Sequence, residues 1–492
     1  MNLLLVPIIL PLAATAICVA LRRVSGLQRV VNFVAALGLA WTGWLLVTAV
    51  QEQGIQSVQL SGWAAPFGIS LVADQLAATL IMLTGIVASM VVLFGFSDLT
   101  SGEEKHGHPI FVQALLTGVC GAFLAGDIFN LYVWFEVMLI ASFGLLVVGG
   151  RKDQIDGAVK YVGLNLIATT AMLAGIGLLY GATGSLNMAA LHLAVEGNMD
   201  QPGILAAASL LLFAFAAKSA MFPLYFWLPA AYHTPSHTTS ALFAALLTKV
   251  GVYTLIRVFS LVFDVQHPLL QVLLVTSGVA TLSLGIFGAM NENHARRVLA
   301  YLVMVSIGIM TLGIAAGTTA AIAGTILYLM QTLIVTAALF MVVGCVAHLA
   351  KTEKLNRMGG LWRSYPIMGA MFVLIMLGVA GIPPTSGFWP KVLLVSALAE
   401  AGRWELVLAV VVGSLATLYA VMRLFSAAFW QATKTRRRAK VDIFRFTPIF
   451  ILTVLVVGFG LNGQGLIDTA RLSSVSIIEP SDYINQVLGE RP

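Results

Sequence analysis

Apolar stretches long enough to cross a bilayer follow one another along almost the whole chain. Only 10% of the 492 residues are charged and 59% are hydrophobic, whereas soluble domains carry roughly 25% charged residues. So few charges cannot cover a water-exposed surface of this size. Since a spanning helix needs about 20 mostly apolar residues, we expect an all-α polytopic membrane protein of about fourteen transmembrane helices. The predicted spans are residues 2–21, 29–50, 76–96, 109–126, 128–149, 160–181, 203–231, 239–260, 268–289, 298–316, 320–349, 367–399, 405–430 and 446–461.

Lysine and arginine gather in alternate loops between these spans, and loops rich in them face the cytoplasm. The basic loops hold Arg22, Arg23, Arg29, Lys105, Arg151, Lys152, Lys160, Arg296, Arg297, Lys351, Lys354, Arg357, Arg363, Lys434, Arg436, Arg437, Arg438, Lys440 and Arg445. The opposite loops and the tail hold Arg257, Arg403, Arg471 and Arg491. This asymmetry predicts a cytoplasmic basic side and two extracytoplasmic termini. Because Arg22 and Arg23 follow the first apolar run, we interpret that run as a retained helix and not as a signal peptide.

Prolines interrupt two of the longest runs and break or kink their helices. They are Pro223 and Pro229 in the first run, and Pro383, Pro384 and Pro390 in the second. A lysine accompanies each break, Lys218 in the first and Lys391 in the second. Interrupted helices in two halves of a chain point to inverted repeats around a site at mid-depth. We therefore divide the chain into helices 1–3 (1–108), a first repeat (109–260), a second repeat (268–430), and a last helix with an extracytoplasmic tail (446–492).

Four ionisable residues lie inside apolar runs: Glu136, Lys218, Lys249 and Lys391. A charge at the bilayer centre costs at least about 2.5–3.5 kcal/mol, so each needs a reason. Burial disfavours a charged lysine and a nearby carboxylate favours it, so such a lysine can take up and release a proton. The sequence therefore predicts a proton relay connected by water. A structural ion pair or a snorkelling side chain remains an alternative for each residue.

Histidine titrates near neutral pH. His233 and His237, in the loop after the first broken helix, are therefore candidates for proton uptake at the cytoplasmic mouth; a solvated loop pair is the alternative. His106 and His108, near Glu103 and Glu104, indicate metal binding only weakly.

The remaining motif search gives no reason to expect a cofactor. Cys18, Cys120 and Cys345 fit neither a zinc nor an iron–sulfur spacing and are expected to be small buried residues. The sequence contains no Walker loop, dinucleotide fingerprint, haem-attachment motif or hydrolase elbow. We therefore expect no cofactor, no metal and no nucleic-acid partner, and a transporter subunit instead of an enzyme.

Several of these runs resemble the antiporter-like membrane subunits shared by respiratory complex I, membrane-bound hydrogenases and Mrp-type cation/proton antiporters. The segment GDIFNLYVWFEVMLIASFGLL resembles the family's fifth helix, whose glutamate matches Glu136. AAKSAMFPLYFWLPAAYHTPSHTTSALFAALLTKVGVYTLIR resembles the broken seventh helix and the eighth, with lysines at Lys218 and Lys249. HARRVLAYLVMVSIG is similar to the start of the tenth helix, and GIPPTSGFWPKVLLV to the broken twelfth, with its lysine at Lys391.

The length and AALLTKVGVYTLIR resemble most the D-type subunits of Mrp antiporters. This resemblance implies a sodium or other monovalent cation/proton antiporter in a prokaryotic plasma membrane, with A, B, C, E, F and G-type subunits as partners. One departure lies in the eleventh helix, where many relatives carry a histidine or lysine and this chain has Gln331, Thr332 and Thr336. A path to Lys391 then depends on bound water, and we expect Lys391 to matter less than Lys218.

Two alternatives stay open. The chain could be a proton-pumping subunit of a redox complex, which shares this chemistry and differs in its partners; neighbouring genes for a hydrogenase or an NADH-oxidising arm would favour it. It could also be a scaffold that no longer conducts. The missing eleventh-helix charge favours the scaffold, whereas the retained Glu136, Lys218 and Lys249 argue against it.

Overall fold

The computed structural model describes residues 2–63, 65, 67–432 and 441–489, and most of them are helical. The helices of the apolar bundle are α1 (Val6–Ala20), α2 (Ser25–Gln53), α3 (Gln75–Asp98), α5 (His108–Leu124), α6 (Ile128–Val147), α7 (Lys152–Thr183), α9 (Pro202–Lys218), α10 (Trp227–Ala231), α11 (His237–Leu261), α12 (Pro268–Asn291), α13 (Ala295–Ala316), α14 (Thr319–Ala350), α15 (Pro366–Ala380), α16 (Phe388–Glu400), α17 (Trp404–Phe425) and α18 (Ile443–Leu461). The other elements are η1 (Leu3–Leu5), β1 (Gln56–Gln59), η2 (Leu60–Gly62), β2 (Ser70–Ala73), α4 (Ser101–Lys105), α8 (Met188–Val195), η3 (Leu355–Arg357), a π-helical turn η4 (Ser426–Trp430), α19 (Gln464–Ile478) and α20 (Ser481–Leu488).

Eleven helices of the described chain are long and apolar enough to cross a membrane, and α5, α9 and α15 are shorter apolar helices. Two of the short ones are the first halves of the broken runs, which continue as α10 and α16. The all-α membrane fold predicted from the sequence is confirmed, and the arrangement is consistent with about fourteen crossings. The two inverted repeats stay a prediction.

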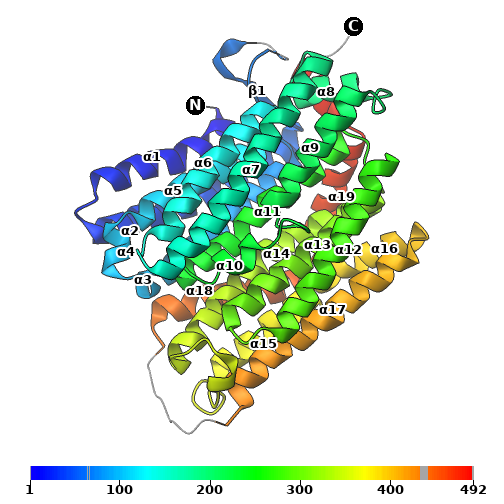
Figure 1. Cartoon of the computed structure of the whole chain (residues 1–492). Coiled ribbons are helices and arrows are strands. Elements are labelled where there is room, and N and C mark those ends of the chain that lie inside the picture. Colours follow the sequence, from blue (N-terminus) through cyan, green and yellow to red (C-terminus); the bar gives the residue numbers. More distant parts are fainter. Residues whose placement is uncertain (1, 64, 66, 433–440, 490–492) are drawn as a thin grey trace.

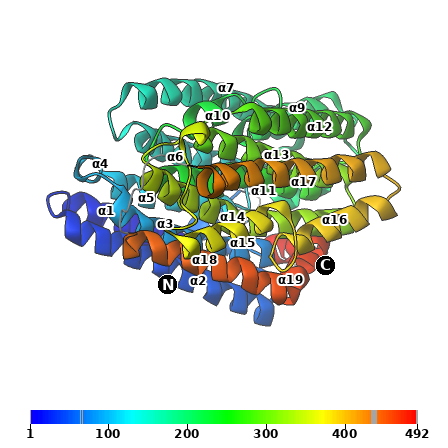
Figure 2. The same ribbon diagram turned by 90° about the horizontal axis from the view of Figure 1, so that it is seen from below.

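The bundle has an inner and an outer set of helices. The most apolar stretch of α11 is 100% buried and that of α13 is 94% buried, whereas the same stretch of α12 or α17 is only 33% buried. Figure 2 shows α11 and α14 between the row formed by α7, α9 and α12 and the row formed by α2 and α18. The outer helices expose large apolar side chains, among them Ile140, Val159 and Leu415. Such outward faces are typical of helices that meet lipid or another membrane subunit.

One end of the bundle carries α4, α10 and the loop after α14, and the opposite end carries β1 and α8 (Figure 1). At the second end β1 pairs antiparallel with β2, Gln56 opposite Ala73. Ser57 Oγ of this hairpin donates to the carbonyl of Gln486 at 2.9 Å, which ties α20 to the hairpin. η1 also contacts β1, so the first and last described helices lie at the same end.

Two expectations about the helices differ from the structure. α7 begins at Lys152, eight residues before the expected 160, because its first two turns are polar and give no apolar signal. α19 and α20 follow α18 where a plain tail was expected, since short amphipathic helices lack a long apolar run. Of the basic-loop residues, Lys434, Arg436, Arg437, Arg438 and Lys440 lie outside the described residues.

Candidate functional site

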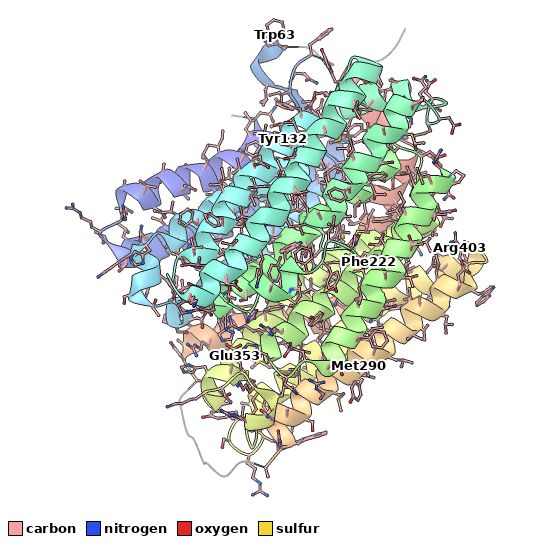
Figure 3. The ribbon with its side chains drawn as sticks, viewed as in Figure 1. Trp63, Tyr132, Phe222, Met290, Glu353 and Arg403 are labelled. Atoms are coloured by element: carbon pink, nitrogen blue, oxygen red, sulfur yellow. The ribbon has the colours of Figure 1, made fainter. Side chains whose placement is uncertain are left out.

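The first broken helix is held in place by side chains that satisfy its freed backbone groups. α9 ends at Lys218, and the chain runs irregularly until α10 begins at Trp227. The Phe222 amide donates to Thr281 Oγ1 of α12 at 2.8 Å, and Trp227 Nε1 donates to the Ala217 carbonyl at 3.0 Å. Figure 3 labels Phe222 at this break, away from both ends of the bundle. A break whose polar groups are paired is a stable structure at membrane depth.

Lys218 meets Glu136 through a third residue, Thr169, which was not among the predicted site residues. Lys218 is 6% exposed, and its Nζ donates to Thr169 Oγ1 at 3.3 Å. Thr169 Oγ1 in turn donates to Glu136 Oε1 at 2.8 Å. Nζ also lies 5.0 Å from the centre of the Phe135 ring, at a distance where a ring face attracts a cation. The structure therefore brings the predicted pair together, but through a hydroxyl.

A small cavity adjoins this lysine. Its volume is about 20 Å³, and Lys218, Asn165 and Tyr161 line it together with apolar side chains. That volume is enough for about one water molecule, and the site offers polar partners. One water molecule therefore fits beside the amine.

Lys249 is 1% exposed, and its Nζ donates to the carbonyl of Ala244 at 2.8 Å. Its helix packs directly on the end of α9, because a Cβ added to Gly251 would lie 2.5 Å from Ser219 Oγ and 3.0 Å from the Lys218 carbonyl carbon. The two helices that carry Lys218 and Lys249 thus touch at the first break.

Lys391 lies at the second break, where its amine satisfies the end of α15. Its Nζ donates to the Ala380 carbonyl at 2.6 Å and to the Val379 carbonyl at 3.3 Å. Gln331 Nε2 donates to the preceding carbonyl, that of Gly378, at 3.1 Å. Gln331, which stands where many relatives have a titratable group, therefore binds the same helix end as Lys391. Since Lys391 is 8% exposed and its amine is held by these carbonyls, the snorkelling alternative does not describe it.

The two candidate uptake histidines belong to a cluster around Glu353. Figure 3 labels Glu353 at the end of the bundle that carries α10 and the loop after α14. Arg296 binds the Glu353 carboxylate through two nitrogens, at 2.7 and 2.6 Å. His237 Nε2 and His294 Nε2 each lie 3.4 Å from a Glu353 oxygen. The His233 ring packs edge-on against His294, with 5.5 Å between ring centres. Glu353 was not predicted, because it follows α14 in sequence and lies in a polar loop.

Charge and burial set the protonation of this cluster. Burial, followed by the positive charges of Arg297 and His294, lowers the pKa of His233 to about 4. Burial alone would raise the pKa of Glu353, but the Arg296 guanidinium outweighs it and holds that pKa below its usual value. The resting cluster is therefore an ionised carboxylate paired with Arg296, beside a neutral His233.

The weakly indicated metal site near His106 and His108 does not form. Glu104 pairs with Arg29 at 2.6 Å, Glu103 caps α4, and His108 Nε2 contacts Thr239 Oγ1 at 2.9 Å. No group of three or more histidine, cysteine or acidic side chains in the described part of the chain could hold a metal ion. The three cysteines are free and buried, as expected.

A further buried ion pair lies in the half of the bundle nearest β1 and α8. Arg257 was expected in a loop, but it is 4% exposed within α11, and its Nη1 lies 2.6 Å from Asp74 Oδ2. Its Nε donates to Tyr253 Oη at 3.2 Å, and its guanidinium lies 5.9 Å from the ring centre of Tyr483 in α20. The apolar run around Arg257 gave no sign of its partner, which lies far away in sequence.

Comparisons with known proteins agree with one another. The family model described as "NADH:quinone oxidoreductase/Mrp antiporter, TM" matches residues 125–417. The chain is similar to the D-type Na(+)/H(+) antiporter subunit of Bacillus subtilis (strain 168), with 36% identity covering 99% of this chain and 100% of the relative. It is also 37% identical to the D-type Na(+)/H(+) antiporter subunit of Alkalihalophilus pseudofirmus, again covering 99% of this chain and 100% of the relative.

Two solved structures have the same fold over 99% of both chains. A chain of the Mrp complex from Dietzia sp. DQ12-45-1b superposes with a TM-score of 0.92 at 27% identity. A chain of an archaeal membrane-bound sulfane sulfur reductase superposes with the same TM-score of 0.92 at 25% identity.

Proposed function

The chain belongs to the NADH:quinone oxidoreductase/Mrp antiporter transmembrane family, and we propose that it carries protons as the D-type component of a multisubunit sodium/proton antiporter. It is a component of a transporter and not an enzyme. Its partners are the other subunits of one membrane complex, together with protons, a monovalent cation and lipid. Because its relatives are antiporter subunits of bacteria, we place the chain in the plasma membrane.

The fold alone does not separate this function from that of a redox-complex subunit, since both solved relatives superpose equally well. Sequence identity separates them, because the curated antiporter subunits reach 36% and 37% over the full length. The antiporter is therefore the better supported function.

The observation that carries the proton path is the environment of three buried lysines. The amines of Lys218, Lys249 and Lys391 donate to neutral oxygens: a threonine hydroxyl in the first case and backbone carbonyls in the other two. A direct carboxylate partner would fix the charge of a buried lysine, whereas neutral acceptors leave both protonation states accessible. A structural ion pair therefore does not account for these lysines, and a proton relay does.

We place Glu136 at the start of this path. Its carboxylate reaches Thr169 and is only partly buried on the outward side of α6 and α7. A partly exposed carboxylate at mid-membrane is costly in lipid, so this flank suits contact with a neighbouring subunit. A charged group of a neighbouring subunit at this flank can strengthen or weaken the electrostatic attraction between Glu136 and Lys218.

We place proton uptake at the Glu353 cluster, on the cytoplasmic side. The negative charge of Glu353 favours proton binding at His294, because it raises the pKa of that histidine against the larger lowering by burial. His233 is neutral at pH 7 because its pKa is about 4, so it passes a proton on without storing it. With the basic end cytoplasmic, both termini are extracytoplasmic, and the two repeats (109–260 and 268–430) carry Lys218 and Lys391 respectively.

The test uses the assembled complex in everted membrane vesicles. Lys249→Met should lower cation-dependent proton flux at least about tenfold, because methionine fills the space but cannot carry a proton. The matched control is Lys152→Met, since Lys152 is exposed at the start of α7. A Lys249→Met complex that assembles and exchanges like the wild type would overturn the proposed path.

A further inference from the structure

A second small cavity lies between helices of the carboxy-terminal half. Its volume is about 20 Å³, enough for about one water molecule. Helices α13, α14, α15 and α17 line it. Its polar lining residues are Ser306, Tyr328, Gln331, Thr332, Thr336 and Thr417.

Gln331, which lines this cavity, has a side-chain oxygen without a hydrogen-bond donor among the described residues. The residue is 3% exposed, and its Nε2 is occupied by the Gly378 carbonyl. Its Oε1 is buried and has no hydrogen-bond partner among the described residues. A buried carbonyl oxygen without a donor costs free energy, and an enclosed water is the usual remedy. The unpaired oxygen and the cavity are thus two independent signs of a bound ligand.

The neighbouring hydroxyls indicate which ligand fits. Ser306 Oγ donates to Val303 O at 2.7 Å. Thr332 Oγ1 donates to Leu329 O at 2.9 Å, and Thr417 Oγ1 donates to Gly413 O at 2.8 Å. Each hydroxyl donates its hydrogen to a carbonyl of its own helix, so its oxygen lone pairs remain free to accept from a molecule in the cavity. Lone pairs suit a molecule that donates, such as water. A metal cation is a poor fit, since no carboxylate lines the cavity.

We propose that Gln331 holds a water molecule in this cavity and that this water passes protons towards Lys391. Gln331 and Lys391 bind three consecutive carbonyls, those of Gly378, Val379 and Ala380, and Val379 also lines the cavity. An incoming proton forms one O–H bond to the water while another O–H bond breaks on the Lys391 side, so the water is unchanged. Gln331 is a positioning residue that acts through this water.

This inference rests on the proposed proton path, and its test separates the two. Gln331→Leu in the assembled complex should lower exchange about tenfold, because it removes the oxygen that orders the water. Gln331→His should restore most of the rate, since one ring nitrogen can donate to Gly378 and the other can relay protons. It should also add a titration near neutral pH to the pH profile, which a purely structural residue would not do.

A second substitution keeps the test valid if Gln331→Leu fails to assemble. Thr332→Val removes a hydroxyl from the cavity wall without touching the Gly378 contact, and should lower exchange severalfold. Thr325→Val on the same helix is the control, because Thr325 does not line the cavity. Wild-type exchange by an assembled Gln331→Leu complex, or by Thr332→Val where Gln331→Leu does not assemble, would overturn the proposal. If Lys249→Met abolished exchange at the same time, the proposed function would stand without this water.

Discussion

Lys218 and Glu136 are joined through one hydroxyl, that of Thr169, which accepts from the lysine at 3.3 Å and donates to the carboxylate at 2.8 Å. A direct ion pair in an apolar setting would hold the proton on the lysine strongly. The intervening hydroxyl weakens that hold and can reorient as the proton moves. A one-unit change in a pKa corresponds to about 1.4 kcal/mol, so a small movement of Glu136 can switch Lys218 between uptake and release.

Thr169→Val should therefore slow exchange by about tenfold or more while the complex assembles normally. Valine keeps the shape of threonine but removes the hydroxyl that, within the described part of the chain, links the lysine to the carboxylate. Thr169→Ser, which keeps the hydroxyl, should restore most of the rate. Thr170→Val is the matched control, because Thr170 is exposed and bonds only its own helix, at the Leu166 carbonyl. Equal rates for Thr169→Val and Thr170→Val in a flux assay would contradict the role of the hydroxyl.

The buried pair of Asp74 and Arg257 should matter for stability. Asp74→Asn leaves a guanidinium uncompensated in a site that is 4% exposed, and breaking such a pair costs about 3–5 kcal/mol. We expect a lower midpoint in a thermal-unfolding scan of the purified complex. Asp74→Asn combined with Arg257→Met should recover part of the loss, since the unpaired charge is gone. A double substitution as unstable as the sum of both single ones would argue against the pair.

The Glu353 cluster predicts a direction for the pH dependence. The negative charge of Glu353 raises the pKa of His294, against the larger lowering by burial. Glu353→Gln removes that charge, so the histidines should bind protons less tightly and the alkaline limb of the exchange profile should move to lower pH. Glu405→Gln, an exposed change at the opposite end, should leave the profile in place. A profile unmoved by Glu353→Gln would remove the cluster from the uptake route.

The chain by itself should not exchange ions. Its outer helices expose Ile140, Val159 and Leu415, and Glu136 is only partly buried in α6, the helix that exposes Ile140. Neighbouring subunits are therefore needed to complete the path. Reconstituted alone, it should show no cation-dependent proton flux. Robust flux from that preparation, after removal of all other subunits, would contradict this expectation.

The charged members of the path could be predicted from sequence because each stands out locally. A lysine or glutamate inside an apolar run is costly wherever the helix packs, so Glu136, Lys218, Lys249 and Lys391 could be picked without any contact information. The membrane helices could also be predicted from local sequence, because each long helix contains a long apolar run.

The neutral members could not be predicted in this way. A threonine in a membrane helix usually bonds its own backbone, so Thr169 looked no different from Thr170 until the packing of α6, α7 and α9 was known. Gln331 could be seen as a departure from the relatives, but its contact with Gly378 lies 47 residues away. Glu353 and Arg257 likewise depend on partners that only the fold brings near.

The coupling of Glu136 to Lys218 is the central claim, and a double-substitution cycle in the assembled complex tests it most directly. Proton flux would be measured in vesicles across the pH range for Glu136→Gln, Lys218→Ala and both together, with subunit assembly checked in each. The account predicts that each single change stops exchange without stopping assembly, and that the double change is no worse than either one. A Glu136→Gln complex that assembles and exchanges at the wild-type rate at every pH would contradict it.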